Sequence, residues 1–377
     1  MGARPGAPRF DFADIVRQHR AALEASQHLS AAQSRVLTDI AQCRTAVLGG
    51  HLETCEKCGH EHPSYNSCRD RHCPRCQALT QEKWIEQQRA RLVDAPHFHV
   101  VFTLPTELRP LAYFAPTTVY ALLFATAAAT LCAFGERHLR ATIGATMVLH
   151  TWTKDLRYHP HVHAIVTAGG LRPDGTWVPA HKRFLFSVKA MSRVFRGKMR
   201  DALRRAHRER AFLGFRAFRD PEAFDQLLNR LGAKSWYVYA KPSFSRAKYV
   251  VEYLGRYTHR VALSNSRILD LSDDRVVIRT RGDGRAPMTP VECLRRFVRH
   301  VLPKRFHKIR HFGIYAGACR SARANTPAPT AAPSPIDFRE RLARLTGRDI
   351  TRCPRCGAPL VSHYLPPSRG PPERRAA

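Results

Sequence analysis

Apolar residues recur at helical spacing in the first part of the chain and at alternate positions further on. Spacings of three and four residues in "DFADIVRQHRAALEA" and "SAAQSRVLTDIAQC" predict helices over 11–45. Alternation in "HFHVVFTLP" predicts a strand near 97–104, and apolar runs predict further strands near 143–152, 161–168 and 235–241. The runs at 143–152 and 161–168 are separated by a polar loop, which favours an antiparallel pair. Strands that interleave with helices in this way indicate an α+β fold.

One long apolar stretch, Leu111–Phe134, is close to the length that spans a membrane. It is rich in Ala and Thr and carries Pro116 near its start, so we favour a buried helix over a membrane span. The first residues, "MGARPGAPRFDFADIV", lack the apolar segment of a signal peptide. We therefore expect a cytoplasmic protein.

The charge balance narrows the class of partner. The chain has 377 residues and holds 62 Lys and Arg against 30 Asp and Glu, a formal net charge of +32. Such an excess suits a polyanion, because each phosphate that a cation neutralises releases condensed counterions. No block of Lys and Arg adjoins an anchoring segment, so nucleic acid is favoured over a membrane surface.

Composition divides the chain into four segments. Residues 10–92 combine the predicted N-terminal helices with a block dense in Cys and His, and residues 93–320 form the main body. The Pro/Ala-rich stretch "SARANTPAPTAAPSP" at 321–335 has too little apolar bulk to fold and indicates a linker. Residues 336–377 hold a small module around "CPRCG" and a tail that we expect to be disordered.

Cysteine spacing in the first segment predicts a zinc site. Within "CEKCGHEHPSYNSCRDRHCPRCQ" the arrangement C-x2-C-x14-C-x2-C is formed by Cys55, Cys58, Cys73 and Cys76. Each C-x2-C pair places two thiolates on one turn, so two pairs fill the tetrahedral positions of a structural Zn²⁺. Cys68 and His72 lie inside the block, so an exchange at one ligand or a second ion stays open. Free buried thiols are the plainer alternative.

Basic residues lie between and beside these cysteines. Arg69, Arg71 and Arg75 flank the predicted zinc ligands and suit contacts with DNA phosphates. The segment is therefore expected to bind DNA rather than to cut it.

Near the C-terminus, Cys353 and Cys356 form half of a zinc site, and a free thiol pair is an equal alternative.

The segment "YHPHVHAIVT" places three imidazoles at alternate positions of a predicted strand. Side chains of a strand alternate between its faces, so His159, His161 and His163 project together while Val162 and Ala164 face the core. A single histidine is more often a packing or surface residue. Strict alternation of several favours a site for a divalent ion.

Tyrosines at helical spacing follow in "YVVEYLGRY". Tyr253 and Tyr257 lie four residues apart and share one face of a predicted helix with Tyr249. An aromatic packing stripe is the plain interpretation. Arg256 and Arg260 beside the tyrosines instead favour an approach by DNA.

These motifs together carry a resemblance. The triplet His161-Val162-His163, the pair Tyr253-x3-Tyr257 and the segment "CRTAVLGGH...C..C...YNSCRDRHCPRCQ" resemble the rolling-circle transposases of the insertion-sequence ninety-one family, which are HUH-type enzymes with two tyrosines. The similarity covers roughly residues 10–320, including "LPKRFHKIRHFGIY".

The resemblance implies an antiparallel-sheet, HUH nuclease-like catalytic domain after an N-terminal zinc-binding domain. It implies that His161 and His163 hold Mg²⁺ or Mn²⁺, and that Tyr253 and Tyr257 attack single-stranded DNA at element ends and at the target. A third metal ligand is not assigned, with His159 and Glu252 as candidates, and Tyr249 is treated as packing. Because no P-loop is present, unwinding would need a separate host helicase.

Two rival functions stay open at this stage. A replication initiator would use the same chemistry. A non-catalytic zinc-ribbon regulator would bind nucleic acid through its charge and cysteines, with the histidines and tyrosines in its core. The regulator differs by forming no covalent adduct with DNA.

Overall fold

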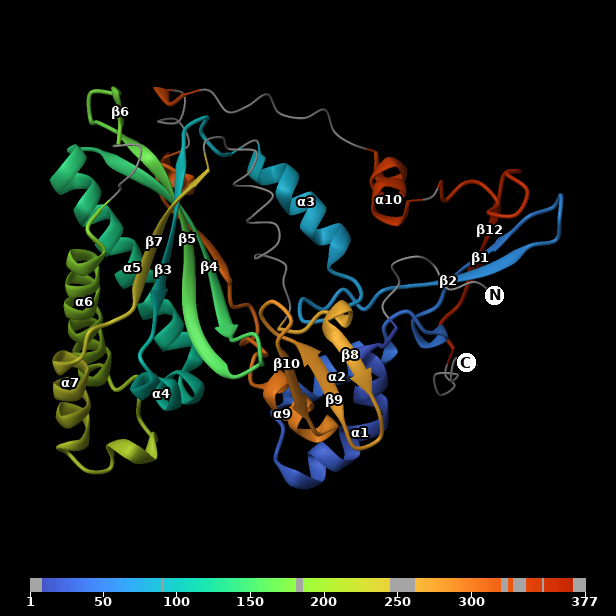
Figure 1. The fold of residues 1–377 in the computed structure, drawn as a ribbon, viewed down its shortest axis with the longest axis horizontal. Helices are drawn as coiled ribbons and strands as arrows, with labels where there is room; N and C mark the ends of the chain where they lie inside the picture. Colours follow the sequence, from blue (N-terminus) through green and yellow to red (C-terminus); the bar gives the residue numbers. More distant parts are fainter. Residues whose placement is uncertain are drawn as a thin grey trace.

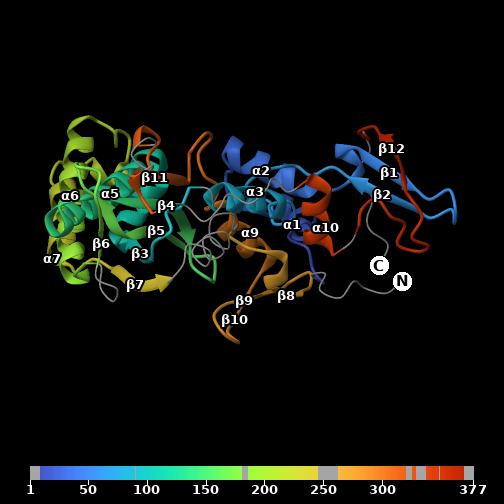
Figure 2. The same ribbon diagram turned by 90° about the horizontal axis from the view of Figure 1, so that it is seen from above.

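The computed structural model describes residues 9–89, 91–180, 186–244, 262–319, 325–327, 337–347 and 349–368. Its elements form a large sheet with helices, a helical group joined to a small sheet, and a narrow second small sheet (Figure 1). Seen from above, these groups follow one another along an elongated molecule (Figure 2).

The large sheet is antiparallel throughout and has the order β11-β4-β5-β3-β7, with β6 paired to β5. Its strands are β3 (His97–Thr103), β4 (Thr142–Trp152), β5 (Tyr158–Leu171), β6 (Trp177–Pro179), β7 (Val238–Phe244) and β11 (Ile309–Gly313). The α+β class and the antiparallel pair of the second and third predicted strands are confirmed. The histidine strand, β5, is central.

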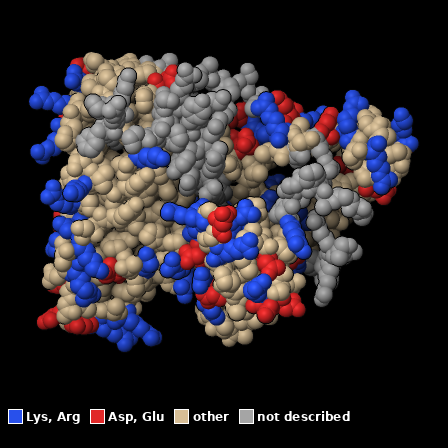
Figure 3. Space-filling model, viewed as in Figure 1, with Lys and Arg blue, Asp and Glu red and all other residues tan. Residues whose placement is uncertain are grey.

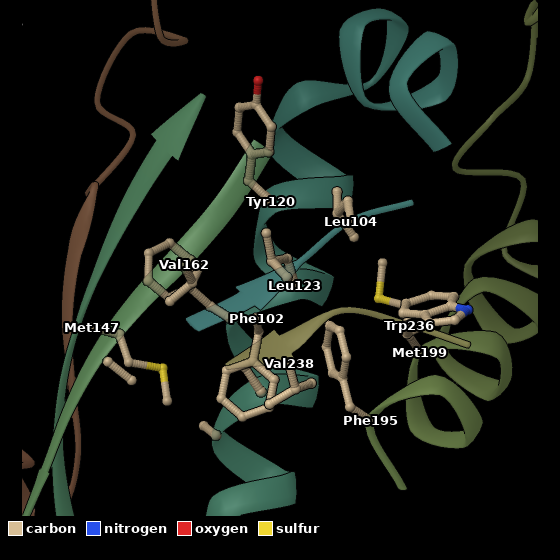
Figure 4. Close-up of a cluster of buried hydrophobic side chains, with 14 of the residues drawn as sticks. Phe102, Leu104, Tyr120, Leu123, Met147, Val162, Phe195, Met199, Trp236 and Val238 are labelled. Carbon is tan, nitrogen blue, oxygen red and sulfur yellow. The ribbon is translucent and has the colours of Figure 1, made fainter. Parts of the chain in front are cut away.

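Helices cover one face of this sheet. They are α4 (Arg109–Phe114), α5 (Pro116–Leu139), α6 (Val188–Arg208) and α7 (Ala223–Ala233). Figure 4 shows the core between them, where Phe102 and Val162 from the sheet meet Leu123 of α5 and Phe195 of α6. Within the described residues, α5 is the helix long and apolar enough to cross a membrane, but it packs into this core, as predicted for the long apolar stretch.

A second hydrophobic core joins the N-terminal helices to residues much later in the chain. It contains α1 (Phe12–Ser26), α2 (Ala31–Gln42), α9 (Pro290–Val298) and a sheet of order β10-β9-β8, formed by β8 (Ile268–Leu271), β9 (Val276–Arg279) and β10 (Arg285–Met288). The rings of Phe12 and Phe297 lie 4.3 Å apart, centroid to centroid. The domain boundaries inferred from composition stay predictions, and the packing adds that residues 262–298 fold against the N-terminal helices.

Local sequence accounts for the starts of the two N-terminal helices. The Asp11 side chain accepts a hydrogen bond from the Ala13 N–H at 2.9 Å, which caps α1. Ser30 and Gln33 form a capping box at the start of α2, where each side chain accepts from the other residue's backbone N–H.

The narrow sheet has the order β12-β1-β2 and is formed by β1 (Gly50–Thr54), β2 (Glu61–Tyr65) and β12 (Val361–Leu365). Beside it, α10 (Phe338–Thr346) packs on α3 (Ala78–Arg89), and the guanidinium of Arg341 lies 2.5 Å from the carboxylate of Glu86. The C-terminal module therefore docks on the N-terminal segment. Part of the tail expected to be disordered, 369–377, lies outside the described residues.

Candidate functional site

The histidine segment forms the start of β5, and its side chains alternate between the two faces of the sheet as predicted. His159, His161 and His163 are partly exposed, whereas Val162 and Ala164 are fully buried in the core under the helices. Because the apolar residues fix the strand, the row of imidazoles is presented on the opposite face.

A third histidine joins two of these. His150 of β4 pairs directly with His161 across the sheet, and one ring nitrogen from each of His150, His161 and His163 lies within 4.8 Å of the others. The sequence reasoning missed His150. The predicted antiparallel pair could have indicated His150, because residues at equal distances from the loop of a hairpin face each other.

Hydrogen bonds orient the rings. The Nδ1 of His161 lies 2.7 Å from the His159 carbonyl oxygen, so the ring donates there and keeps its Nε2 lone pair for an ion. The Nδ1 of His163 lies 2.8 Å from the Nε2 of His99 on β3. Burial lowers the pKa of His161 to about 4, and burial together with Lys241 lowers the pKa of His99 to about 4. Both rings are therefore neutral at neutral pH, which is the form that binds metal.

The three histidines open onto a cavity of about 950 Å³. Residues of β3, β4, β5 and β7 in the sheet line one part of the cavity, and residues around the β9–β10 turn line another. Among the described residues that line it, the aromatic side chains are Trp152, Tyr237 and Tyr239, and the cationic side chains are Lys154, Lys241, Arg281 and Arg285. Tyr237 and Tyr239 are 63% and 40% exposed, which leaves their rings accessible from solvent. Figure 3 shows Lys and Arg at the outer edge of the helices and, mixed with Asp and Glu, over the β8–β10 group.

The remaining predicted residues of this site fall into two groups. His159 lies apart from the three gathered nitrogens, because Arg109 donates to its Nδ1 at 2.8 Å. The structure therefore does not support His159 as the third ligand. The other group lies outside the described residues and comprises Glu252 and the predicted catalytic and DNA-binding residues Tyr253, Tyr257, Arg256 and Arg260.

The cysteines do not form the predicted single cluster. Cys73 and Cys76 gather with Cys68 and with Cys43, the residue that ends α2, so that the four sulfur atoms lie within 4.8 Å of one another. Cys43 and Cys73 have no exposed surface and belong to the second core. Cys68, an alternative in the sequence analysis, is therefore a member, and Cys43 was missed.

The geometry of a hairpin explains why the predicted pairing was wrong. Cys55 and Cys58 lie at the tip of the β1–β2 hairpin, whereas Asn66 at its base bonds to Gly49 and Arg44. Five-residue strands separate tip from base by roughly 16 Å, which prevents the two C-x2-C pairs from sharing an ion. The sulfur atoms of Cys55 and Cys58 instead lie with those of Cys353 and Cys356.

The Cys43 cluster fits a structural zinc ion. Four thiolates complete a tetrahedral Zn²⁺ and leave no position for water. Hydrogen bonds from Cys68, Cys73 and Cys76 lower the pKa of the Cys43 thiol, and the same contacts raise the pKa of the Cys73 thiol, so the group favours a thiolate at Cys43 that its neighbours share. The donor set is thus suited to zinc rather than to catalysis.

Polar residues near this cluster stabilise the fold. Arg71 donates to the carbonyl oxygens of Phe306 and Pro303 at 2.6 and 2.8 Å, and Arg75 pairs with Asp11. Both guanidinium groups are therefore engaged by other groups of the protein. This removes the reason for predicting that they contact DNA phosphates.

Of the other two predicted residues here, Arg69 is exposed. His72 was a candidate metal ligand, but both of its ring nitrogens are engaged, with Asp70 at 2.9 Å and with the Leu302 N–H at 3.2 Å.

An α+β protein that combines an open three-histidine site in a cationic, aromatic cavity with a separate, closed cysteine site is suited to processing DNA. Comparisons with known families give the particular class. A model described as "Transposase zinc-binding domain", of the IS91 (insertion sequence ninety-one) type, matches residues 15–104, and one described as "Putative transposase" matches residues 144–323. The chain belongs to the IS91 family of transposases, which have an N-terminal zinc-binding domain.

Two relatives support this assignment. The chain is 42% identical over 387 aligned residues to a protein named "Putative transposase y4qJ" from Sinorhizobium fredii, covering 96% of this chain and 97% of that protein. It is 30% identical over 349 residues to the transposase of insertion sequence element IS801 from Pseudomonas savastanoi pv. phaseolicola, covering 86% of this chain and 82% of that protein. No solved structure matches the chain. The protein is thus a DNA-acting transposase with structural zinc.

Proposed function

We propose that this transposase nicks and rejoins single-stranded DNA through a 5′-phosphotyrosine intermediate, and moves its insertion sequence by a rolling-circle route. The observation that supports the proposal is the set of three histidines, His150, His161 and His163, gathered beside a large cationic cavity. Neutral imidazoles that face a cavity form an open metal site, in contrast to a closed structural one.

The donor set fits a divalent transition ion. Imidazole nitrogens suit first-row transition dications better than Mg²⁺, which prefers oxygen ligands, so Mn²⁺ is the better probe of the two. A Mg²⁺ or Mn²⁺ ion bound there supplies Lewis-acid polarisation of the scissile phosphate. His99 and the His159 carbonyl oxygen keep the rings of His163 and His161 in the orientation that this requires.

The nucleophile is proposed from the family pattern, because Tyr253 and Tyr257 lie outside the described residues. The phenolic oxygen of one tyrosine forms a bond to phosphorus, and the bond from phosphorus to the 3′ oxygen breaks. The departing oxygen takes up one proton and the phenol, with a usual pKa of about 10, loses one. The phosphodiester energy stays in the covalent link, and strand transfer reverses the step on another DNA end.

The cavity suits a single strand better than a duplex. Trp152, Tyr237 and Tyr239 provide aromatic faces on which unpaired bases stack. Lys241 and Arg281, which also line the cavity, provide cations for contacts with the backbone phosphates. Since the bases must be unpaired, we also propose that a separate host helicase supplies the single strand.

An adduct assay tests the proposal. Purified protein is incubated with Mn²⁺ and labelled single-stranded oligonucleotides that span the ends of the element, and the label on protein after denaturing electrophoresis is measured. We expect an adduct that is lost without metal and in Tyr253→Phe/Tyr257→Phe. His161→Ala/His163→Ala should lower its rate by about 10³-fold, because a metal contributes several kcal/mol to transition-state stabilisation.

The matched control is His60→Ala/His62→Ala, which removes two imidazoles at the same spacing at the start of β2 and should leave the adduct unchanged. Tight binding with no adduct on any end-derived strand would contradict the mechanism and would return the zinc-ribbon regulator as the better description.

A further inference from the structure

Two short segments from opposite ends of the chain adopt the same turn. They are "CEKCG" at 55–59 and "CPRCG" at 353–357. The Gly59 N–H donates to the Cys55 carbonyl oxygen at 2.8 Å, and the Gly357 N–H donates to the Cys353 carbonyl oxygen at 2.9 Å. Both glycines have positive φ, +63° and +74°, a conformation that glycine adopts without strain. Each segment is therefore a knuckle that presents two thiols on one side.

The two knuckles face each other. The Sγ of Cys55 lies 3.5 Å from the Sγ of Cys356, and the Sγ of Cys58 lies 3.6 Å from the Sγ of Cys353. All four sulfur atoms lie within 4.8 Å of one another. A tetrahedral ion with metal–sulfur bonds of about 2.3 Å requires sulfur atoms about 3.8 Å apart, whereas a disulfide requires about 2.05 Å. The spacing fits four ligands around one ion.

Burial is divided in the same way in both knuckles. The first cysteine of each pair is buried, with Cys55 2% exposed and Cys353 3% exposed, and the second, Cys58 or Cys356, is exposed. An ion between them would therefore lie at the surface of the narrow sheet, away from the histidine cavity, whose lining includes none of these cysteines.

Secondary structure holds the two knuckles in register. β12 pairs antiparallel with β1 over five residues, from Gly50 opposite Leu365 to Thr54 opposite Val361, and each knuckle adjoins this pair. The packing of α10 on α3, with the Arg341–Glu86 ion pair, adds a second contact between the same two segments. The four cysteines are therefore brought together by an ordered interface between the two segments.

We infer that Cys55, Cys58, Cys353 and Cys356 bind a second structural Zn²⁺ that clamps the C-terminal module, 337–368, onto the N-terminal zinc-binding domain. The family model for the zinc-binding domain ends at residue 104 and does not reach the C-terminal pair. Neither knuckle can complete a tetrahedral site by itself, so the site forms only when both ends of the chain are present. A metal that closes so long a loop also restricts the unfolded chain, which adds to stability.

Metal content gives the first test. The full chain, purified without added metal and analysed by mass spectrometry for elements, should contain one zinc ion more than Cys353→Ser/Cys356→Ser, whatever the three-histidine site retains. The matched control is Cys132→Ser/Cys319→Ser, which removes two cysteines that belong to neither cluster and should keep the zinc content of the unmodified chain. Equal zinc content in the unmodified chain and in Cys353→Ser/Cys356→Ser, or iron in place of the lost zinc, would overturn the inference.

Retention of the module gives a second test that does not depend on counting ions. A protease recognition sequence is inserted between Ala331 and Ala332 of the full chain, the protein is cleaved, and the pieces are separated by size under native conditions. The C-terminal piece should stay bound in the otherwise unmodified protein and should dissociate in Cys353→Ser/Cys356→Ser. Both forms keep the β12–β1 and α10–α3 contacts, so the difference isolates the ion. Equal retention or equal loss in the two forms would refute the clamp.

Discussion

The Cys43 cluster and the histidine site both gather side chains that can bind a metal ion, but the cluster encloses the ion and the histidine site leaves it open. The four cysteines lie in a core, with Cys43 and Cys73 fully buried, and their sulfur atoms occupy every position around an ion. The three histidines project from a rigid strand pair onto a cavity of about 950 Å³, so an ion held there keeps positions for other groups. A closed site stabilises a fold, whereas an open one acts on a ligand.

This difference predicts how each site responds to the loss of one ligand. A missing thiolate in a closed site removes the ion together with the folding free energy that binding supplies. A missing imidazole in the open site leaves the sheet intact, because the apolar residues Val162 and Ala164 on the opposite face hold β5 in the core. Stability and activity should therefore separate between the two regions.

Cys73→Ser should have the largest effect on stability. The hydroxyl is a poor ligand for zinc, and the loss of a structural ion removes on the order of 10 kcal/mol of binding free energy, comparable with the whole stability of a domain. We expect the variant to lose one zinc ion and the cooperative unfolding of the core that contains α1, α2 and α9. Metal analysis and thermal unfolding by circular dichroism measure both.

Cys293→Ser is the matched control, because Cys293 is fully buried in the same core but belongs to no cysteine cluster. It should cost only about 1–3 kcal/mol, the penalty of a buried hydroxyl without a partner, and should keep all of its zinc. If the two variants lost equal stability and equal zinc, the Cys43 cluster would not be a metal site.

The two regions also differ in how far the sequence predicts them. The histidine face follows from local alternation, since neighbouring side chains of a strand point to opposite faces whatever the rest of the chain does. His161 and His163 were therefore placed correctly on one face of a central strand. His150 lies on the partner strand, and only the register of the hairpin brings it opposite His161.

The cysteine sites depend on contacts between distant segments. The spacing of Cys55, Cys58, Cys73 and Cys76 predicts correctly that each C-x2-C pair contributes two thiols to one cluster, but not which other thiols complete each cluster. Cys43 begins the segment quoted for the resemblance, but it has no C-x2-C partner, so spacing alone did not assign it as a ligand. The C-terminal pair becomes a partner of the hairpin tip only through β12 and α10, elements that the sequence did not indicate.

The same limit applies to the fold. Four strands of the large sheet, β3, β4, β5 and β7, were predicted from alternation and apolar runs, whereas β6 and β11 were not. The long apolar stretch was recognised as a buried helix. The sequence did not predict that residues 12–43 and 262–298 share a core. Amphipathic periodicity shows that one face of an element is buried, but not which element it packs against.

His150→Ala should have the next largest effect and should change activity alone. We expect the Mn²⁺ concentration needed for adduct formation to rise by about 10²-fold or more, since even partners beyond the ligands tune metal affinity by about 10–100-fold. The unfolding temperature should change little. A titration of adduct yield against Mn²⁺ measures the effect.

The control for His150→Ala is His300→Ala. His300 is also buried, but it bonds to Thr151 and to the Leu156 carbonyl oxygen and does not belong to the gathered three. It should lower stability and leave the Mn²⁺ dependence unchanged. An unchanged Mn²⁺ dependence in His150→Ala would leave the site with two histidine ligands and would reopen the search for the third.

Tyr239→Ala should have the smallest effect and tests what the open site binds. The ring is 40% exposed, lies edge-on to His99 with centroids 6.4 Å apart, and forms part of the cavity wall. Stacking on one base is worth about 1–3 kcal/mol, so the affinity for a single-stranded end oligonucleotide, measured by fluorescence anisotropy, should fall by roughly 10-fold. Tyr239→Phe keeps the aromatic face and should bind as the unmodified protein does. An equal loss in Tyr239→Phe would show that the hydroxyl matters and not the ring, and an equal loss of duplex binding in Tyr239→Ala would show that the cavity does not distinguish unpaired bases.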